Sequence, residues 1–148
     1  MRLTIVAGLA ICSIMTACNR QGPDEPVIVT PSSTFSAKVD GKSFVATEIQ
    51  GSATASSLYV TGTSNAGTGK AASIALSLPR ISSLAAYPID SSNKGEYRES
   101  GVVYKASSGS INITTNNDVH VAGGFSFDAG DSTQVTRTIT SGSFDLYK

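Results

Sequence analysis

The chain has 148 residues, and its 11 Lys and Arg balance 11 Asp and Glu, giving a formal net charge of zero. Because no basic block stands out, the composition gives no electrostatic footprint for nucleic acid. One His and two Cys supply too few ligands for a transition-metal site of the Cys/His kind. We therefore expect no nucleic acid partner and no cofactor.

The chain begins with a targeting pattern. Arg2 supplies one positive charge, and Leu3 to Ala17 then runs without another charged residue, which is the layout of a secretory signal. This run is shorter than the roughly 20 residues that a helix needs to cross a bilayer. We predict that residues 1–17 are a signal peptide.

Both cysteines lie close to the predicted cleavage site. The run Met15-Thr16-Ala17-Cys18 resembles the lipobox of bacterial lipoproteins, in which the Cys after the cut carries a diacylglycerol and an acylated amino group. The resemblance implies lipidation of Cys18 and loss of Cys12 with the signal. Two or three acyl chains anchor a protein stably, because each buried methylene contributes about 0.8 kcal/mol. The alternative is that Cys18 lies near a conventional cleavage site by chance.

The residues after Cys18 bear on location. Asn19, rather than Asp, follows the Cys, and in lipoproteins of enteric bacteria this implies transport to the outer membrane. The protein would face either the periplasm or the outside. Residues 18–33 contain three prolines and no periodic pattern, so we expect a lipid-anchored flexible tether. Residues 34–148 are then a single β domain, long enough to bury a core without disulfides.

Alternating apolar residues dominate the chain after the tether. Phe35, Ala37 and Val39 share one face of a strand, and Asp40-Gly41 follows as a two-residue hairpin signal. The same alternation predicts further strands, separated by turn residues. They cover residues 44–46, 58–62, 73–78, 102–106, 110–115, 119–128, 134–140 and 143–147. Between two prolines, Ser82 to Ala86 has room for one helical turn.

About nine short strands predict an all-β fold, with an antiparallel two-sheet sandwich favoured and a partly closed β-barrel as the alternative. Within it, Phe125 and Phe127 project from one face, as do Ile111 and Ile113. Aromatic residues facing β-branched ones across a strand pair are typical of a core. The pair Gly123-Gly124 indicates a bulge or a close backbone approach.

Short motifs point to a family. They are "FSAKVDGKSFVAT", "YPI" at residues 87–89, "GSINITTNNDVHVAGGFSFDA" and "VTRTITSGSFDLYK". Together they resemble the uncharacterised lipoproteins of bacteroidetes-type Gram-negative bacteria, which carry one small β domain of unknown function behind a lipidated Cys. The resemblance covers most of residues 34–147 and implies a fold and a location but no activity. Phe44 stands where relatives often have Trp.

Catalytic signatures are scarce. His120 is the only His, and no G-x-S-x-G elbow accompanies it. It lies on the alternate face from Val119 and Val121, so we expect it to face solvent. Ser91 to Lys94 matches S-x-x-K but lacks the helix and the two partner motifs of that chemistry, and "GTGKA" at residues 67–71 lacks the full phosphate-loop spacing. Glu96 and Glu99 would face opposite sides of a strand, unlike the carboxylate pair of a glycosidase.

Two further patterns concern ligands. Asp128 and Asp131 are candidate calcium ligands, but two carboxylates fall short of the six to eight oxygens that calcium takes, so we expect no metal. The run Asp131-Ser132-Thr133 also looks like a short O-glycosylation acceptor. The candidate stacking platforms for a sugar are tyrosines, namely Tyr59, Tyr87, Tyr97, Tyr104 and Tyr147.

Three functions follow from these patterns. The favoured one is a non-catalytic binding or structural module of the cell envelope, bound to the membrane by lipid and recognising an envelope protein or glycan through its loops. The alternatives are a carbohydrate-binding surface module and an envelope hydrolase. A barrel with an apolar lumen would instead indicate a small lipophilic ligand.

Overall fold

The structure is a computed structural model that describes residues 32–65 and 71–148. The predicted signal peptide at residues 1–17, Cys18, nearly all of the predicted tether and residues 67–70 of "GTGKA" lie outside these ranges. Within them, no helix is long and apolar enough to cross a membrane. The described residues form ten strands: β1 Thr34–Val39, β2 Lys42–Val45, β3 Glu48–Ala53, β4 Leu58–Ser64, β5 Ala72–Leu78, β6 Ala86–Pro88, β7 Lys94–Glu99, β8 Val102–Asn116, β9 His120–Gly130 and β10 Thr136–Tyr147.

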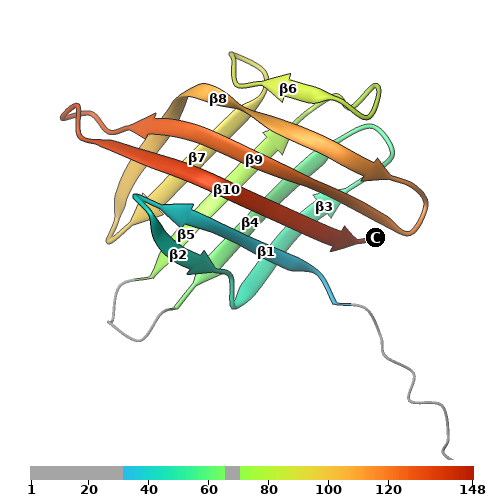
Figure 1. Cartoon of the computed structure of the whole chain (residues 1–148), viewed down its shortest axis with the longest axis horizontal. Coiled ribbons are helices and arrows are strands. Elements are labelled where there is room, and N and C mark those ends of the chain that lie inside the picture. Colours follow the sequence, from blue (N-terminus) through green and yellow to red (C-terminus); the bar gives the residue numbers. More distant parts are fainter. Residues whose placement is uncertain (1–31, 66–70) are drawn as a thin grey trace, which may run out of the picture. The chain divides into compact units, whose positions relative to one another are not determined.

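The strands form one antiparallel sheet in the order β2-β1-β10-β9-β8-β7-β5-β4-β3, with β6 paired to β8. This sheet curls over into a half-barrel, so that β1, β9 and β10 cross in front of β3, β4, β5 and β7 (Figure 1). Strand β8 joins the two layers, because it pairs with β7 on one side and β9 on the other. The predicted antiparallel all-β fold is confirmed, with a single continuous sheet supplying both layers.

The two layers fill the interior with different side chains. All five phenylalanines are buried, and all lie on the β1-β2-β10-β9 layer. Phe125 is central, with ring centroids 5.2 Å from Phe35, 6.2 Å from Phe127 and 6.4 Å from Phe144. The facing strands β4 and β5 contribute aliphatic residues, and these are Leu58, Val60, Ile74, Leu76 and Leu78. Aromatic rings therefore occupy the space inside the half-barrel.

Inward-facing glycines make room for these rings. An added Cβ would lie 2.5 Å from the Phe35 ring at Gly62, and 2.6 Å from the Phe125 ring at Gly142. Both distances are far below normal carbon–carbon contact. A glycine in a strand costs conformational entropy, and here that cost is offset by close ring packing between strands.

Register shifts explain where the predicted strands differ from the observed ones. The segments predicted at 102–106 and 110–115 are one strand, β8, with bulges after Ala106 and Ile113. Those at 134–140 and 143–147 are also one strand, β10, bulged after Ile139. A bulge inverts the alternation of side chains, so in sequence a continuous strand reads as two. The close approach at Gly123 is confirmed, since a Cβ there would lie 2.0 Å from the carbonyl oxygen of Asn112.

Three strands were not predicted. Strand β3 carries mostly small or polar residues at the sheet edge, β6 has only three residues, and β7 alternates Gly95 and Tyr97 with charged residues. The segment Ser82 to Ala86 is a loop running into β6 and contains no helical turn. There the Tyr87 hydroxyl accepts hydrogen bonds from the backbone N–H groups of Ser82 and Ser83, at 2.9 and 3.0 Å.

Candidate binding site at the open end of the half-barrel

Two tight hairpins bring polar groups to one end of the half-barrel. Asp40 and Gly41, between β1 and β2, have φ angles of 49° and 79°; Ser100 and Gly101, between β7 and β8, have φ angles of 53° and 82°. Positive φ at both central residues defines the type I′ turn that suits the twist of antiparallel strands. The predicted Asp40-Gly41 hairpin is thus confirmed, and it positions Asp40 against the start of β10.

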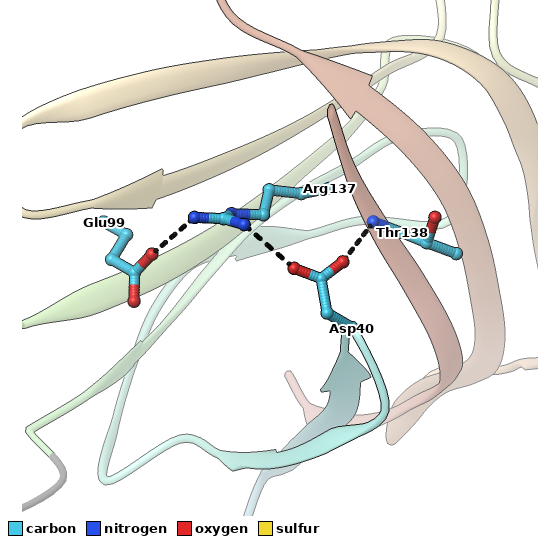
Figure 2. Close-up of polar contacts among 4 residues, drawn as sticks. All are labelled: Asp40, Glu99, Arg137 and Thr138. Atoms are coloured by element: carbon cyan, nitrogen blue, oxygen red, sulfur yellow. Dashed lines mark hydrogen bonds and ion pairs between the residues drawn. The ribbon is translucent and has the colours of Figure 1, made fainter. Parts of the chain in front are cut away.

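Arg137 links the two layers at this end. Its Nη1 lies 3.1 Å from Oδ2 of Asp40 and its Nη2 lies 3.5 Å from Oε2 of Glu99 (Figure 2). The other oxygen of Asp40 accepts a hydrogen bond of 2.9 Å from the backbone N–H of Thr138. Asp40 belongs to the β1-β10 layer and Glu99 ends β7 in the facing layer, so one guanidinium holds both layers together.

An aromatic pair orients this arginine. The guanidinium carbon of Arg137 lies 5.2 Å from the centroid of the Tyr104 ring, within the range of a cation–π interaction. Tyr104 in turn packs on Tyr97, with centroids 5.7 Å apart. Arg137 Nε is buried and has no acceptor among the described residues. The guanidinium is held by its contact with the Tyr104 ring and by its two ion pairs.

The pKa values reflect this setting. Desolvation alone would lower the pKa of Arg137, but its interactions with Tyr104, Asp40 and Glu99 outweigh it and raise that pKa. Burial, followed by the nearby charge of Glu99, raises the pKa of Tyr97 to about 12. The site therefore holds a permanent cation beside a tyrosine that stays neutral at physiological pH.

A depression of about 250 Å³ opens beside the cluster formed by Asp40, Glu99 and Arg137. Its polar lining consists of Asp40, Lys42, Ser43, Ser64, Glu99 and Arg137, and the rest of the lining is Val39, Phe44, Ala72 and Tyr97. These residues come from the β1–β2 hairpin and from the ends of β4, β5, β7 and β10. The depression is thus lined by residues of both layers.

The predicted tyrosine platforms lie in different environments. Tyr97 and Tyr104 are buried in the core, although Tyr97 also lines the depression, and Tyr87 is half-buried. Tyr147 is also half-buried, with its ring centroid 5.4 Å from that of His120. Tyr59 is the one member of the set with a largely exposed ring, on the outer face of β4. The structure therefore does not bring these five tyrosines together on one surface.

The candidate calcium ligands Asp128 and Asp131 have hydrogen-bond partners within the protein. Oδ1 of Asp131 accepts hydrogen bonds from the backbone N–H groups of Thr133 and Val135, at 2.8 and 2.9 Å, and from the Thr133 hydroxyl at 2.9 Å. The Asp128 carboxylate lies 3.4 Å from the Ser108 hydroxyl. Asp131 thus shapes the β9–β10 loop, and its contact with Thr133 involves part of the predicted glycosylation acceptor.

The other predicted motifs have structural surroundings. The backbone N–H groups of Ser92 and Asn93 donate to Asp90 Oδ1, both at 2.7 Å, so "SSNK" forms a turn into β7. Glu96 points outward and pairs with Arg98 at 2.5 Å, whereas Glu99 lines the depression. The expectation that the two glutamates face opposite sides is confirmed.

Sequence reasoning missed Arg137 as a site residue and took Asp40 only as a turn residue. The alternation of inward and outward residues along the strands contained a usable signal for this site. The inward row of β4 ends at Ser64, that of β7 ends at Glu99, and Arg137 precedes Ile139 on the inward face of β10. An inward position that becomes polar at the same end of several strands indicates a site at that end.

Comparison with known proteins gives one family. No curated protein and no solved structure matches the chain. Residues 31–146 match the family described as Domain of unknown function (DUF6252), a span that includes all the described strands but for the last residue of β10. The chain therefore belongs to the DUF6252 family of domains of unknown function.

Proposed function

We propose that this protein is a lipoprotein of the Gram-negative outer membrane whose β domain is a non-catalytic binding module. The lipobox-like run ending at Cys18, Asn19 after it and the proline-containing tether support the location. The bacteroidetes-type motifs of the domain support the same assignment. The open end of the half-barrel is the part of the domain that would contact a partner.

The depression beside Arg137 is the observation that carries the binding role. A glycosidase-type hydrolase needs one carboxyl group that donates a proton and a second that acts as base or nucleophile. In the depression, Asp40 and Glu99 both contact the same guanidinium, so they are arranged as partners of a cation. His120, the one His of the chain, packs on Tyr147 and does not line the depression.

Lipidation is tested by the change Cys18→Ala in the full chain. We expect the wild type to incorporate labelled palmitate and to sediment with membranes, because its acyl chains bury many methylenes. The variant should do neither. Uptake of palmitate by the Cys18→Ala variant, followed by membrane sedimentation, would show that the anchor lies elsewhere.

Binding is tested by capture from envelope extract. The full chain is immobilised and compared with a Glu99→Arg variant, which places a second cation beside Arg137, and with the matched control Glu96→Arg on the outer face. We expect a component that the wild type and Glu96→Arg retain and that Glu99→Arg loses. Equal capture by all three proteins would exclude the open end as the binding surface.

A further inference from the structure

We propose that the depression at the open end of the half-barrel binds one sugar unit, either a free monosaccharide or the end of a glycan chain. This inference rests on the proposed binding function and names its ligand class. The ligand would lie against Glu99, Arg137 and the hydroxyl groups of Ser43 and Ser64, between residues of the two layers.

The depression offers a mixture of hydrogen-bond donors and acceptors. Glu99 and Asp40 supply carboxylate acceptors, Arg137 and Lys42 supply N–H donors, and the serine hydroxyls do both. A sugar hydroxyl can also donate and accept at once, so a ring with several hydroxyls can use both kinds of group. An apolar ligand would leave these charged groups desolvated and without new partners, which is costly.

The charges that line the depression favour some sugars over others. Asp40, Glu99 and Arg137 sum to one negative charge, because the single guanidinium contacts two carboxylates. Lys42 at the rim adds a separate cation. An anion entering beside Glu99 would meet a carboxylate of like charge there, whereas a neutral sugar would not, and an aminated sugar would be attracted to that carboxylate.

The size and surface of the depression suit one sugar ring. The depression of about 250 Å³ is smaller than the roughly 300–1,000 Å³ typical of sites for drug-sized ligands, which favours a single ring over a larger molecule. Val39, Phe44 and Ala72 provide apolar wall that matches the C–H face of a sugar ring. Phe44 is itself buried in the core and packs edge-on against Phe35, with centroids 6.4 Å apart, so this wall is rigid.

A purely structural role explains the contacts of Asp40 but not those of Glu99. Asp40 is held by Thr138 and Arg137, as expected of a residue that fixes a turn. The contact between Glu99 and Arg137 is longer, at 3.5 Å, and the Glu99 side chain is 37% exposed. This carboxylate therefore keeps acceptor capacity that points into the depression, and it is the residue we expect to contact the sugar directly.

The test is a ligand-observed NMR titration of the purified full chain in detergent with glucose, glucosamine and glucuronate, each up to about 50 mM to cover the weak affinity of a small ligand. We expect glucose or glucosamine to bind at least tenfold more tightly than glucuronate. The change Glu99→Ala should weaken binding about tenfold, the effect of losing a hydrogen bond to a charged group. The matched control Glu96→Ala should bind as the wild type does.

Three results would overturn the proposal. They are no binding of any of the sugars, glucuronate binding as tightly as glucose, or equal loss of binding in the Glu99→Ala and Glu96→Ala variants. If no sugar binds but a partner from envelope extract still depends on Glu99, the binding function stands and the sugar assignment fails. A disaccharide that binds more tightly than its monosaccharide would identify a glycan chain as the source.

Discussion

The middle of the half-barrel and its open end are built from the same strands with different inward side chains. In the middle, β4 presents Val60 and Gly62, and β10 presents Gly142 and Phe144. Toward the open end, the same inward row reaches Ser64 on β4, Glu99 on β7 and Arg137 on β10. The change from rings and glycines to charges and hydroxyls occurs within a few residues on each strand.

This difference shows how one sheet supplies both a core and a site. Where rings lie over glycines, the layers are in close contact and the interior is filled. Where small serines and paired charges replace them, the side chains leave a depression of about 250 Å³. Substitutions in the middle should therefore change stability, and substitutions at the end should chiefly change binding.

The largest effect is expected from Phe125→Ala, which removes the ring at the centre of the aromatic layer. Phe125 is 5% exposed and contacts three other phenylalanines. A cavity of this kind costs about 3–5 kcal/mol of unfolding free energy, measurable by urea denaturation. The control Val119→Ala removes a side chain that is 59% exposed and should change stability by less than about 0.5 kcal/mol. Similar losses in both variants would contradict the aromatic core.

A somewhat smaller effect is expected from Gly62→Val, which places a branched side chain where the Phe35 ring lies 2.5 Å from a Cβ position. Overpacking of this kind costs about 1–3 kcal/mol, again measured by denaturation. The control Gly130→Ala has its nearest neighbour at 3.9 Å from the added Cβ, so it should be close to neutral. A Gly62→Val variant as stable as the wild type would show that ring and glycine are not in close contact.

Alkaline pH tests the buried tyrosine between the two regions. The pKa of Tyr97 is raised to about 12 from 10.0, so the folded state retains a proton that the unfolded state loses. The unfolding free energy should therefore fall by about 1–2 kcal/mol between pH 10 and pH 12. The measurement is urea denaturation across this range, with Tyr97→Phe as the comparison. If the decrease persists in full in Tyr97→Phe, it arises from other groups.

The smallest effect on stability is expected from Arg137→Met at the open end. Its ion pairs and ring contact are partly exposed, so their loss should cost about 1 kcal/mol, and less at high salt. The control Arg98→Met removes an exposed pair on the outer face and should cost no more than about 0.5 kcal/mol. A loss as large as that of Phe125→Ala would mean that the open end is part of the core.

Much of the fold follows from local pattern. The Asp40-Gly41 turn and the alternation around Phe35, Ile74 and Phe125 are strong because one face of each strand is buried. Strands β3 and β7 escaped prediction since small, glycine or charged residues interrupt that alternation. The bulges that join the halves of β8 and β10 are set by pairing between strands, which one sequence does not display.

The site was harder to predict than the fold. Asp40, Glu99 and Arg137 are far apart in sequence and share no motif. Their meeting depends on the order of the strands, which places β10 beside β1 and lets the curled sheet bring β7 opposite. The tyrosines were predicted as sugar-stacking platforms from their residue type alone. In the structure Tyr97 pairs with Tyr104 across β7 and β8, and both residues are buried.

The most direct test of the division between core and site is an amide-resolved NMR titration of the full chain with the sugar that binds best. The account predicts chemical-shift changes at Ser43, Phe44, Glu99 and Arg137, and none around Tyr59 on the outer face of β4. Changes centred on Tyr59, or spread evenly over the sheet, would contradict a binding site at the open end.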